Sequence, residues 1–91
     1  REIDQRVDIF AFGVTMYETL TGQKPFNGET SRDVLLAQKN RDQHFAMPCE
    51  LNPSIPADVE RIILKCIEFD VDKRYPHISY LVAELRKALY V

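Results

Sequence analysis

The first strong pattern in the chain is an apolar stretch over residues 9–20. Apolar side chains recur there at helical spacing, and further apolar residues lie between them. The residues at the helical positions are Ile9, Phe12, Met16, Tyr17 and Leu20, and those between them are Phe10, Ala11 and Val14. A helix that is apolar almost all round is usually buried, so this segment is expected to form the central helix of the fold.

Two glycines in and after this stretch refine the prediction. Gly13 costs about 1 kcal/mol relative to Ala inside a helix, which predicts that another backbone packs very close to it. Gly22 is expected to end the helix, and Pro25 keeps it ended. The unbroken apolar run, residues 9–14, is far shorter than the ~18 residues that a membrane span needs. The pattern therefore predicts a core helix and no membrane segment.

The rest of the chain also reads as helical, and no segment predicts a strand. A short, weakly amphipathic helix is expected over Glu29 to Lys39, followed by an ordered loop over residues 40–56, where three prolines prevent long regular structure. A second helix is expected to start at Pro56, with acidic residues in its first turn and apolar residues at helical spacing through Ile67. After a charged connection over residues 70–76, apolar residues define a last amphipathic helix that ends near Tyr90: Ile78, Leu81, Val82, Leu85 and Leu89. The prediction is an all-α fold of about four helices with one long ordered loop.

Length and composition restrict the possible classes. Ninety-one residues make at most one domain, which buries only ~60 to 65% of its unfolded surface and is marginally stable. The net charge is -2, and the chain has no basic stripe, so nucleic acid binding has no support. The cysteines, Cys49 and Cys66, form no C-x-x-C pair, and the histidines, His44 and His77, lie far from each other in sequence, which argues for a reduced cytoplasmic setting and against a zinc site. The chain begins at Arg1 and carries no targeting segment, so we expect one partial domain, residues 1–91, cut from a longer protein.

Four stretches, in order, resemble the end of the larger lobe of eukaryotic-type (Hanks-type) Ser/Thr protein kinases. Asp8-x-Phe10-x-x-Gly13, with the sequence that follows it through Pro25-Phe26, is similar to the F helix of that family and the loop after it. Leu64-Lys65-Cys66-Ile67-x-x-Asp70-x-x-x-Arg74 resembles the H helix and the Asp-Pro-x-x-Arg connection, with Val71 in place of the usual proline. The final helix is similar to the I helix, and residues 51–56 and 73–76 are similar to bacterial members. Order and spacing together make this resemblance specific.

The resemblance implies structural roles for two residues. The carboxylate of Asp8 would accept hydrogen bonds from the backbone of the catalytic loop and hold that loop in its working shape. Sequence alone would favour a simpler role for Asp8, the N-cap of an apolar helix. Arg74 would pair with the glutamate of the A-P-E motif and fix the activation segment to the lobe. Because that glutamate would lie upstream of Arg1, Arg74 is expected either to find another acceptor here or to stay solvated, and in the solvated case Arg74→Ala would cost less than ~1 kcal/mol.

The chemistry of a kinase is absent from this sequence. It has no Gly-rich loop, no lysine and glutamate pair for the phosphates, no catalytic-loop aspartate and no Asp-Phe-Gly. No catalytic, cofactor-binding or metal-binding residue is therefore assigned, and ATP and Mg²⁺ are implied only for a full kinase. Asp70-x-Asp72 has the spacing that opens a calcium loop, but the sixth position is not glycine and Leu81 occupies the twelfth, where a bidentate glutamate is needed. Cys66 lies on an apolar helix face, which favours a core position over a nucleophile.

Two functions remain open at this point. The chain is either the C-terminal part of an active Ser/Thr kinase, which scaffolds the catalytic loop and the activation segment and offers a docking face near residues 29–39, or a pseudokinase or interaction module without catalysis. The implied partners are the remainder of the kinase domain and protein substrates or regulators. An uncovered apolar patch is expected on the first helix, and with it self-association. The residues expected in that patch are Val7, Phe10, Val14 and Tyr17.

Overall fold

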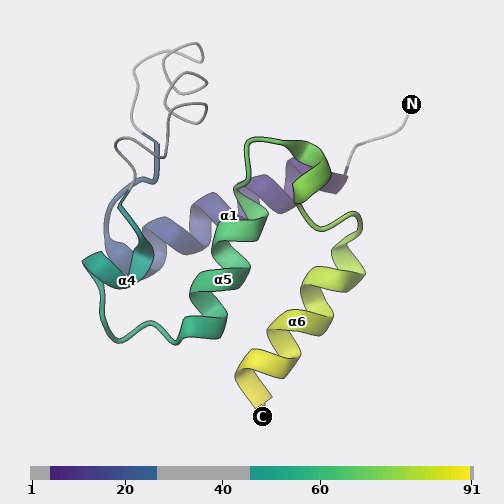
Figure 1. Cartoon of the computed structure of the whole chain (residues 1–91). Coiled ribbons are helices and arrows are strands. Elements are labelled where there is room, and N and C mark those ends of the chain that lie inside the picture. Colours follow the sequence, from purple (N-terminus) through teal and green to yellow (C-terminus); the bar gives the residue numbers. More distant parts are fainter. Residues whose placement is uncertain (1–4, 27–45, 91) are drawn as a thin grey trace.

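The computed structural model describes residues 5–26 and 46–90, and these form four α-helices and one 3-10 turn (Figure 1). The α-helices are α1 (Gln5–Thr21), α4 (Pro48–Leu51), α5 (Ala57–Cys66) and α6 (Ile78–Tyr90), and the 3-10 turn is η1 (Val71–Lys73). No strand occurs in these two ranges. The predicted all-α fold is therefore confirmed. The helix expected over residues 29–39 lies outside the described residues, as does the first part of the expected loop.

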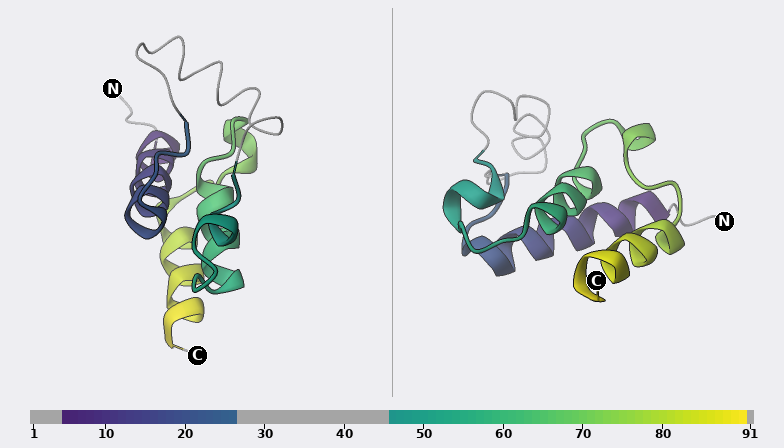
Figure 2. Two further views of the ribbon diagram at one scale, coloured as in Figure 1. Left: turned by 90° about the vertical axis from the view of Figure 1, so that its left-hand side faces the viewer. Right: turned by 60° about the horizontal axis from the view of Figure 1, so that its bottom comes forward.

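The long helix α1 lies beside α5, and α6 diverges from α1, as Figure 2 shows from two sides.

The end of α1 is set by Gly22, which has a φ of +76° and donates its N–H to the carbonyl oxygen of Glu18 at 2.8 Å. Glycine adopts this left-handed conformation without the Cβ clash that other residues meet. The predicted end of the first helix is confirmed.

The core forms where α1 and α5 meet. A Cβ added to Gly13 would lie 2.5 Å from the Cβ of Cys66 and 2.8 Å from a side-chain methyl of Ile67, so only glycine permits this approach. The close neighbour predicted from Gly13 is the carboxyl end of α5. The buried side chains come from α1 and α5, from the segments that flank them, and from α6: Ile9, Tyr17, Phe26, Ile55, Val59, Ile62, Ile63, Cys66, Ile67, Tyr75 and Leu81.

The described part of the expected loop, residues 46–56, contains the single helical turn α4 because Pro48 occupies a first-turn position, where proline is tolerated. The carboxylate of Glu50 accepts the N–H of Met47 at 2.7 Å, and that of Glu60 accepts the N–H of Cys49 at 2.8 Å. Pro56 immediately precedes α5 as its N-cap residue, one position earlier than the first turn predicted from sequence.

The last helix is attached to both α1 and α5 by polar contacts. The side-chain oxygen of Gln5 accepts the N–H of Ile78 at 3.0 Å, which satisfies a donor at the start of α6. Arg61 on α5 forms an ion pair with Glu84 on α6 at 3.0 Å.

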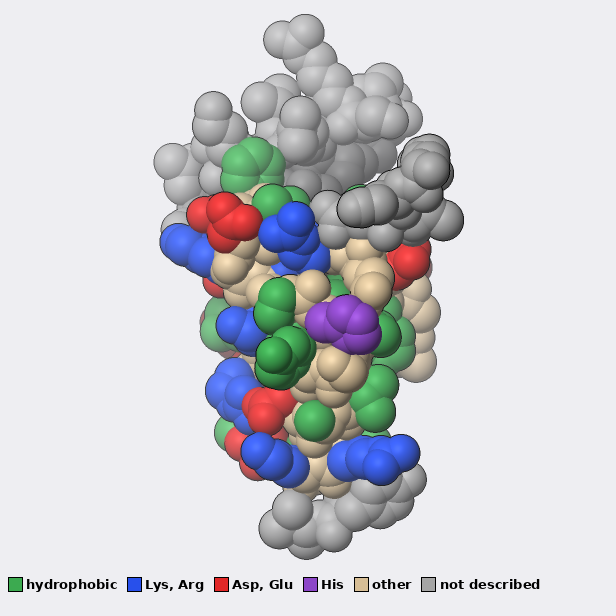
Figure 3. Space-filling view, turned by 90° about the vertical axis from the view of Figure 1, so that its right-hand side faces the viewer, with side chains coloured by type: hydrophobic (Ala, Val, Ile, Leu, Met, Phe, Trp, Pro, Cys, Tyr) green, Lys and Arg blue, Asp and Glu red, His purple; other side chains and the backbone are tan. Residues whose placement is uncertain are grey.

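Figure 3 shows the face that lies on the right-hand side of Figure 1, where hydrophobic side chains are exposed among charged ones.

The prediction of an uncovered apolar patch on α1 is wrong for three of its four residues. Tyr17 is only 2% exposed and donates its hydroxyl to the carbonyl oxygen of Ala46, and Phe10 and Val14 pack against the core. Of the four expected residues only Val7 is exposed. The reason is that segments far along the chain, including Phe26 and Ala46, cover this side of α1, which the local pattern does not reveal.

Candidate functional site

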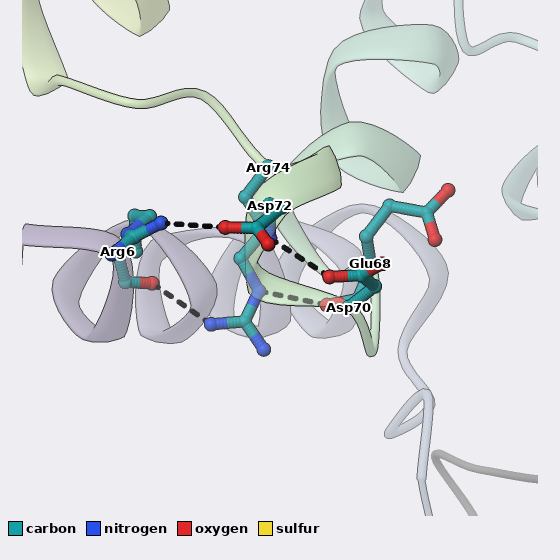
Figure 4. Close-up of polar contacts among 5 residues, drawn as sticks. All are labelled: Arg6, Glu68, Asp70, Asp72 and Arg74. Atoms are coloured by element: carbon teal, nitrogen blue, oxygen red, sulfur yellow. Dashed lines mark hydrogen bonds and ion pairs between the residues drawn. The ribbon is translucent and has the colours of Figure 1, made fainter.

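Arg74 lies directly after η1, and its guanidinium binds backbone carbonyls of two segments, one just before η1 and one at the start of α1 (Figure 4). Its Nε donates to the carbonyl oxygen of Glu68 at 2.7 Å, and one Nη donates to the carbonyl oxygen of Arg6 at 3.2 Å. Arg74 is only 9% exposed. Of the two sequence alternatives, a new acceptor is therefore observed, and the solvated state is wrong. A planar, permanently charged guanidinium suits such a forked set of acceptors.

The turn before Arg74 explains the direction that the backbone takes at this residue. The carboxylate of Asp70 accepts the N–H of Asp72 at 3.0 Å and so caps η1, and the N–H of Arg74 closes the turn on the carbonyl of Val71 at 3.2 Å. Arg74 then takes an extended backbone, with a ψ of 171°. An exposed ion pair of 3.2 Å between Arg6 and Asp72 joins the same two segments, although such pairs contribute at most about 1 kcal/mol.

Aromatic rings complete the environment of Arg74. The guanidinium carbon lies 4.6 Å from the centroid of the Phe10 ring, within the range of a cation–π contact. The Phe10 ring in turn stacks on Phe26, with centroids 6.1 Å apart and planes inclined by 7°. Arg74 thus fastens the connection between α5 and α6 onto the amino-terminal half of α1.

The second predicted site residue, Asp8, is exposed in the first turn of α1. It is not the N-cap, because the helix already begins at Gln5. Arg74 contacts residues 6 and 10 of the same helix, and a step of two helical residues is a rotation of about 200°, so the Asp8 side chain leaves the opposite side of α1. Asp8 thus lies within the amino-terminal part of α1 and Arg74 packs against that same part, but the structure does not bring their side chains together.

Asn52 is a structural residue that the sequence reasoning missed. Its amide nitrogen donates to the carbonyl oxygen of Leu20 at 2.8 Å, which satisfies an acceptor in the last turn of α1, and its amide oxygen accepts the N–H of Ser54 at 3.1 Å. An asparagine before a proline is a turn signal, so the second contact could have been expected. The first contact joins residues 32 positions apart, and no local signal predicts it.

Neither cysteine suits nucleophilic chemistry. Burial raises the pKa of the Cys66 thiol to about 12, and the side chain is fully buried, so the expected core role is confirmed. The Glu60 carboxylate beside Cys49, together with burial, raises the pKa of that thiol as well. Both groups stay protonated near neutral pH.

The described residues form neither a metal-ligand cluster nor a glycine-rich phosphate loop. Residues 5–26 and 46–90 contain no group of three or more His, Cys, Asp and Glu side chains that could hold a metal ion. Gly13 is packed against α5 and Gly22 ends α1, so neither belongs to a glycine-rich phosphate loop. No helix of the described ranges combines the length and the apolarity that crossing a membrane requires.

Comparisons with known proteins identify the family. The model of the protein tyrosine and serine/threonine kinase family matches residues 1–85. The chain is 42% identical over 76 residues to the tyrosine-protein kinase MasK of Myxococcus xanthus, covering 84% of this chain and 12% of that protein. It is 36% identical over 84 residues to the serine/threonine-protein kinase PrkC of Bacillus subtilis, covering 92% and 13%.

A further relative extends the match over almost the whole sequence. The chain is 35% identical over 89 residues to the serine/threonine-protein kinase Pkn1 of Myxococcus xanthus, covering 98% of this chain and 13% of that protein. The chain thus spans 12 to 13% of the length of these three relatives. The predicted resemblance to bacterial-type protein kinases is confirmed: this chain belongs to the protein tyrosine and serine/threonine kinase family.

Proposed function

We propose that residues 1–91 are one partial domain, the C-terminal helical part of a kinase catalytic domain that transfers phosphate from ATP to hydroxyl groups of proteins. The family match over residues 1–85 is the observation that carries this proposal. The chain itself is not the catalyst, because its sequence lacks the phosphate-binding and catalytic motifs. We choose Ser/Thr specificity because PrkC and Pkn1, which match more than nine-tenths of this chain, are serine/threonine kinases.

In this proposal the fragment supports the active site from behind. Helix α1 is fixed against α5 at Gly13, so a group on α1 has a rigid base. The exposed carboxylate of Asp8 then accepts hydrogen bonds from the backbone of the catalytic loop. Arg74 joins η1 to α1. From that fixed position its guanidinium pairs with the glutamate of the A-P-E motif and fixes the activation segment to the lobe.

The proposed partners follow from the same assignment. They are the remainder of the kinase domain and protein substrates or regulators, in the cytoplasm. Segment 29–39, which lies outside the described residues, is the proposed docking face for these proteins. Nucleic acid has no place in this proposal, since the chain is weakly acidic with a net charge of -2.

The first test is to determine the coding sequence around the segment that encodes residues 1–91 and to assay the encoded protein for phosphate transfer from radiolabelled ATP. A glycine-rich loop, paired lysine, catalytic aspartate and Asp-Phe-Gly, together with phosphoserine or phosphothreonine products, would support the proposal. Replacement of those motifs with no phosphate transfer would instead identify a pseudokinase or an interaction module.

The scaffolding role needs a variant of the active protein. Asp8→Asn should lower kcat by at least about tenfold while the fold is kept, because an amide supports the loop backbone less well than a carboxylate. Asp58→Asn is the matched control, since Asp58 is also an exposed aspartate near the start of a helix. Equal activity of both variants would contradict the role of Asp8.

A further inference from the structure

The start of α6 is held by three separate hydrogen bonds. The N–H of Ile78 donates to the side-chain oxygen of Gln5 on α1 at 3.0 Å, and the N–H of Tyr80 donates to the carbonyl oxygen of His77 at 3.1 Å. The N–H between them, that of Ser79, donates to Nδ1 of the His77 imidazole at 3.1 Å. Because the first N–H groups of a helix have no partner within the helix, these contacts complete the first turn of α6.

His77 stands immediately before α6 and takes the place of an N-cap residue. Ser, Thr, Asp and Asn are the usual N-cap residues, because a side-chain oxygen accepts an N–H of the first turn. At this helix the Nδ1 atom of the imidazole is the acceptor. The same atom lies 2.9 Å from the hydroxyl oxygen of Ser79, and the side chain of His77 is exposed to solvent.

The donors around Nδ1 determine the protonation state of the His77 imidazole. A backbone N–H only donates, so Nδ1 accepts the Ser79 N–H only while it carries no proton. The structure therefore corresponds to the neutral imidazole with its proton on Nε2. A proton on Nδ1 would remove the acceptor of Ser79 and would place a positive charge at the positive end of the α6 dipole.

No charged partner offsets a proton on His77 among the described residues. Residues 78–83 of α6 are all uncharged, and the polar contacts of His77 in the described ranges are those with Ser79 and Tyr80. No ion pair joins His77 to the charged groups of the surrounding elements, which are Arg6 and Asp8 on α1, Arg61 and Lys65 on α5, Glu68, Asp70, Asp72, Lys73 and Arg74 in the connection, and Glu84 on α6.

We propose that His77 is an acid-sensitive cap that fastens the first turn of α6 to α1. Histidine ordinarily changes its charge between about pH 8 and 5. At the upper end of this range the neutral imidazole binds Ser79 and keeps Ile78 in place for its contact with Gln5. At the lower end protonation removes the cap, and the first turn of α6 loosens from α1. This proposal stands independently of the proposed kinase activity.

The first test compares the acid sensitivity of three chains. Urea unfolding of the 91-residue chain is followed by circular dichroism at about pH 7.5 and about pH 5.5. Between the two, the unfolding equilibrium constant of the wild type should rise about threefold to tenfold more than that of His77→Asn, because an asparagine oxygen caps the helix at both pH values. The control is His44→Asn, which changes the other histidine of the sequence and should keep the wild-type dependence.

The second measurement locates the effect at Ser79. Nitrogen NMR of the wild-type imidazole should show the Nε2–H form of His77 at about pH 7.5. The protection of the Ser79 N–H against hydrogen exchange should fall at least about threefold at about pH 5.5, relative to the intrinsic exchange rate at each pH. In His77→Asn this protection should be equal at both pH values.

Three results would overturn the proposal. Equal acid sensitivity of the wild type and His77→Asn would show that the cap is not its cause. An Nδ1–H form of His77 at about pH 7.5 would be unable to accept the Ser79 N–H. Loss of the acid sensitivity in His44→Asn would assign it to the other histidine. If His77→Asn does not fold, the two NMR measurements on the wild type decide the question.

Discussion

Helix α1 meets its two long neighbours in different ways. Against α5 it approaches so closely that Gly13 leaves no space for a Cβ, and the side chains between the two helices are almost fully buried. Against α6 the helices diverge, and a groove with apolar walls remains between their carboxyl-terminal halves. Both neighbours are amphipathic, so an apolar stripe alone does not produce a closed contact. A small residue at the crossing point determines how close two helices come.

The largest expected effect is at the closed contact. Gly13→Ala should destabilise the chain by about 2 to 3 kcal/mol, because the overlap of the new Cβ with Cys66 and Ile67 exceeds the gain of about 1 kcal/mol in helix propensity. Urea unfolding followed by circular dichroism measures this difference. Gly22→Ala is the control: nothing lies within 4 Å of its Cβ, so only the strain of a φ of +76° applies, and the loss should be about 1 kcal/mol. A Gly13→Ala variant as stable as the wild type would show that α1 and α5 do not approach this closely.

The next effect concerns Arg74, which fastens the connection between α5 and α6 to the amino-terminal half of α1. Arg74→Ala should cost about 2 kcal/mol, since it removes two charge-assisted hydrogen bonds to partly buried backbone carbonyls and a contact with the Phe10 ring. This exceeds the loss of less than ~1 kcal/mol expected for a solvated arginine. Arg74→Lys should recover part of the loss by keeping the charge. Lys73→Ala, at the exposed neighbouring position, should change the free energy of unfolding by less than about 0.5 kcal/mol. If Arg74→Ala behaved like Lys73→Ala, the guanidinium would not be buried.

A smaller effect is expected at the wall of the groove. Asn52→Ala should cost about 1 kcal/mol, because the carbonyl oxygen of Leu20 loses its side-chain donor. Asn52→Asp keeps the acceptor for Ser54 but places a negative charge at the negative end of α1, so it should be at least as destabilising. Thermal unfolding compares the two variants. An Asp variant more stable than the Ala variant would contradict the contact with Leu20.

The smallest effect is pH-dependent and lies between α5 and α6. The Arg61 guanidinium holds the pKa of the Glu84 carboxyl below its ordinary value of 4.5. A carboxyl with a lowered pKa in the folded state stabilises the fold above pH 4.5, and this contribution is lost as the pH falls through the lowered pKa.

The comparison of variants isolates this contribution. Glu84→Gln should therefore remove part of the acid sensitivity of the free energy of unfolding below pH 4.5, and Arg61→Gln should have the same effect because it removes the cause. Unchanged acid sensitivity in both variants would show that this pair contributes nothing measurable to stability.

Much of this fold follows from local patterns. The helices α1, α5 and α6, the end of α1 at Gly22, the close neighbour of Gly13 and the core position of Cys66 all agree with the sequence predictions. Each depends on helical periodicity or on the conformational range of one residue, which short-range physics decides. The family, too, was evident from the order and spacing of short motifs.

The sites were less accessible from sequence. The acceptors of Arg74 are backbone carbonyls, one of them 68 residues away, and every residue carries such a carbonyl. The contact of Asn52 with Leu20 has the same character. Because a backbone carbonyl is the same whatever the side chain, no sequence pattern identifies which carbonyl a donor will reach.

The sequence by itself determined the all-α class, the positions of the described long helices and the kinase family, because these depend on periodicity, chain stiffness and motif order. Only the tertiary structure decided which apolar residues stay exposed. Tyr17 became buried and Phe12 did not, although both are aromatic residues of the same helix. The side of a helix that remains open depends on which distant segments pack against it, and that is fixed by the free energy of the whole arrangement.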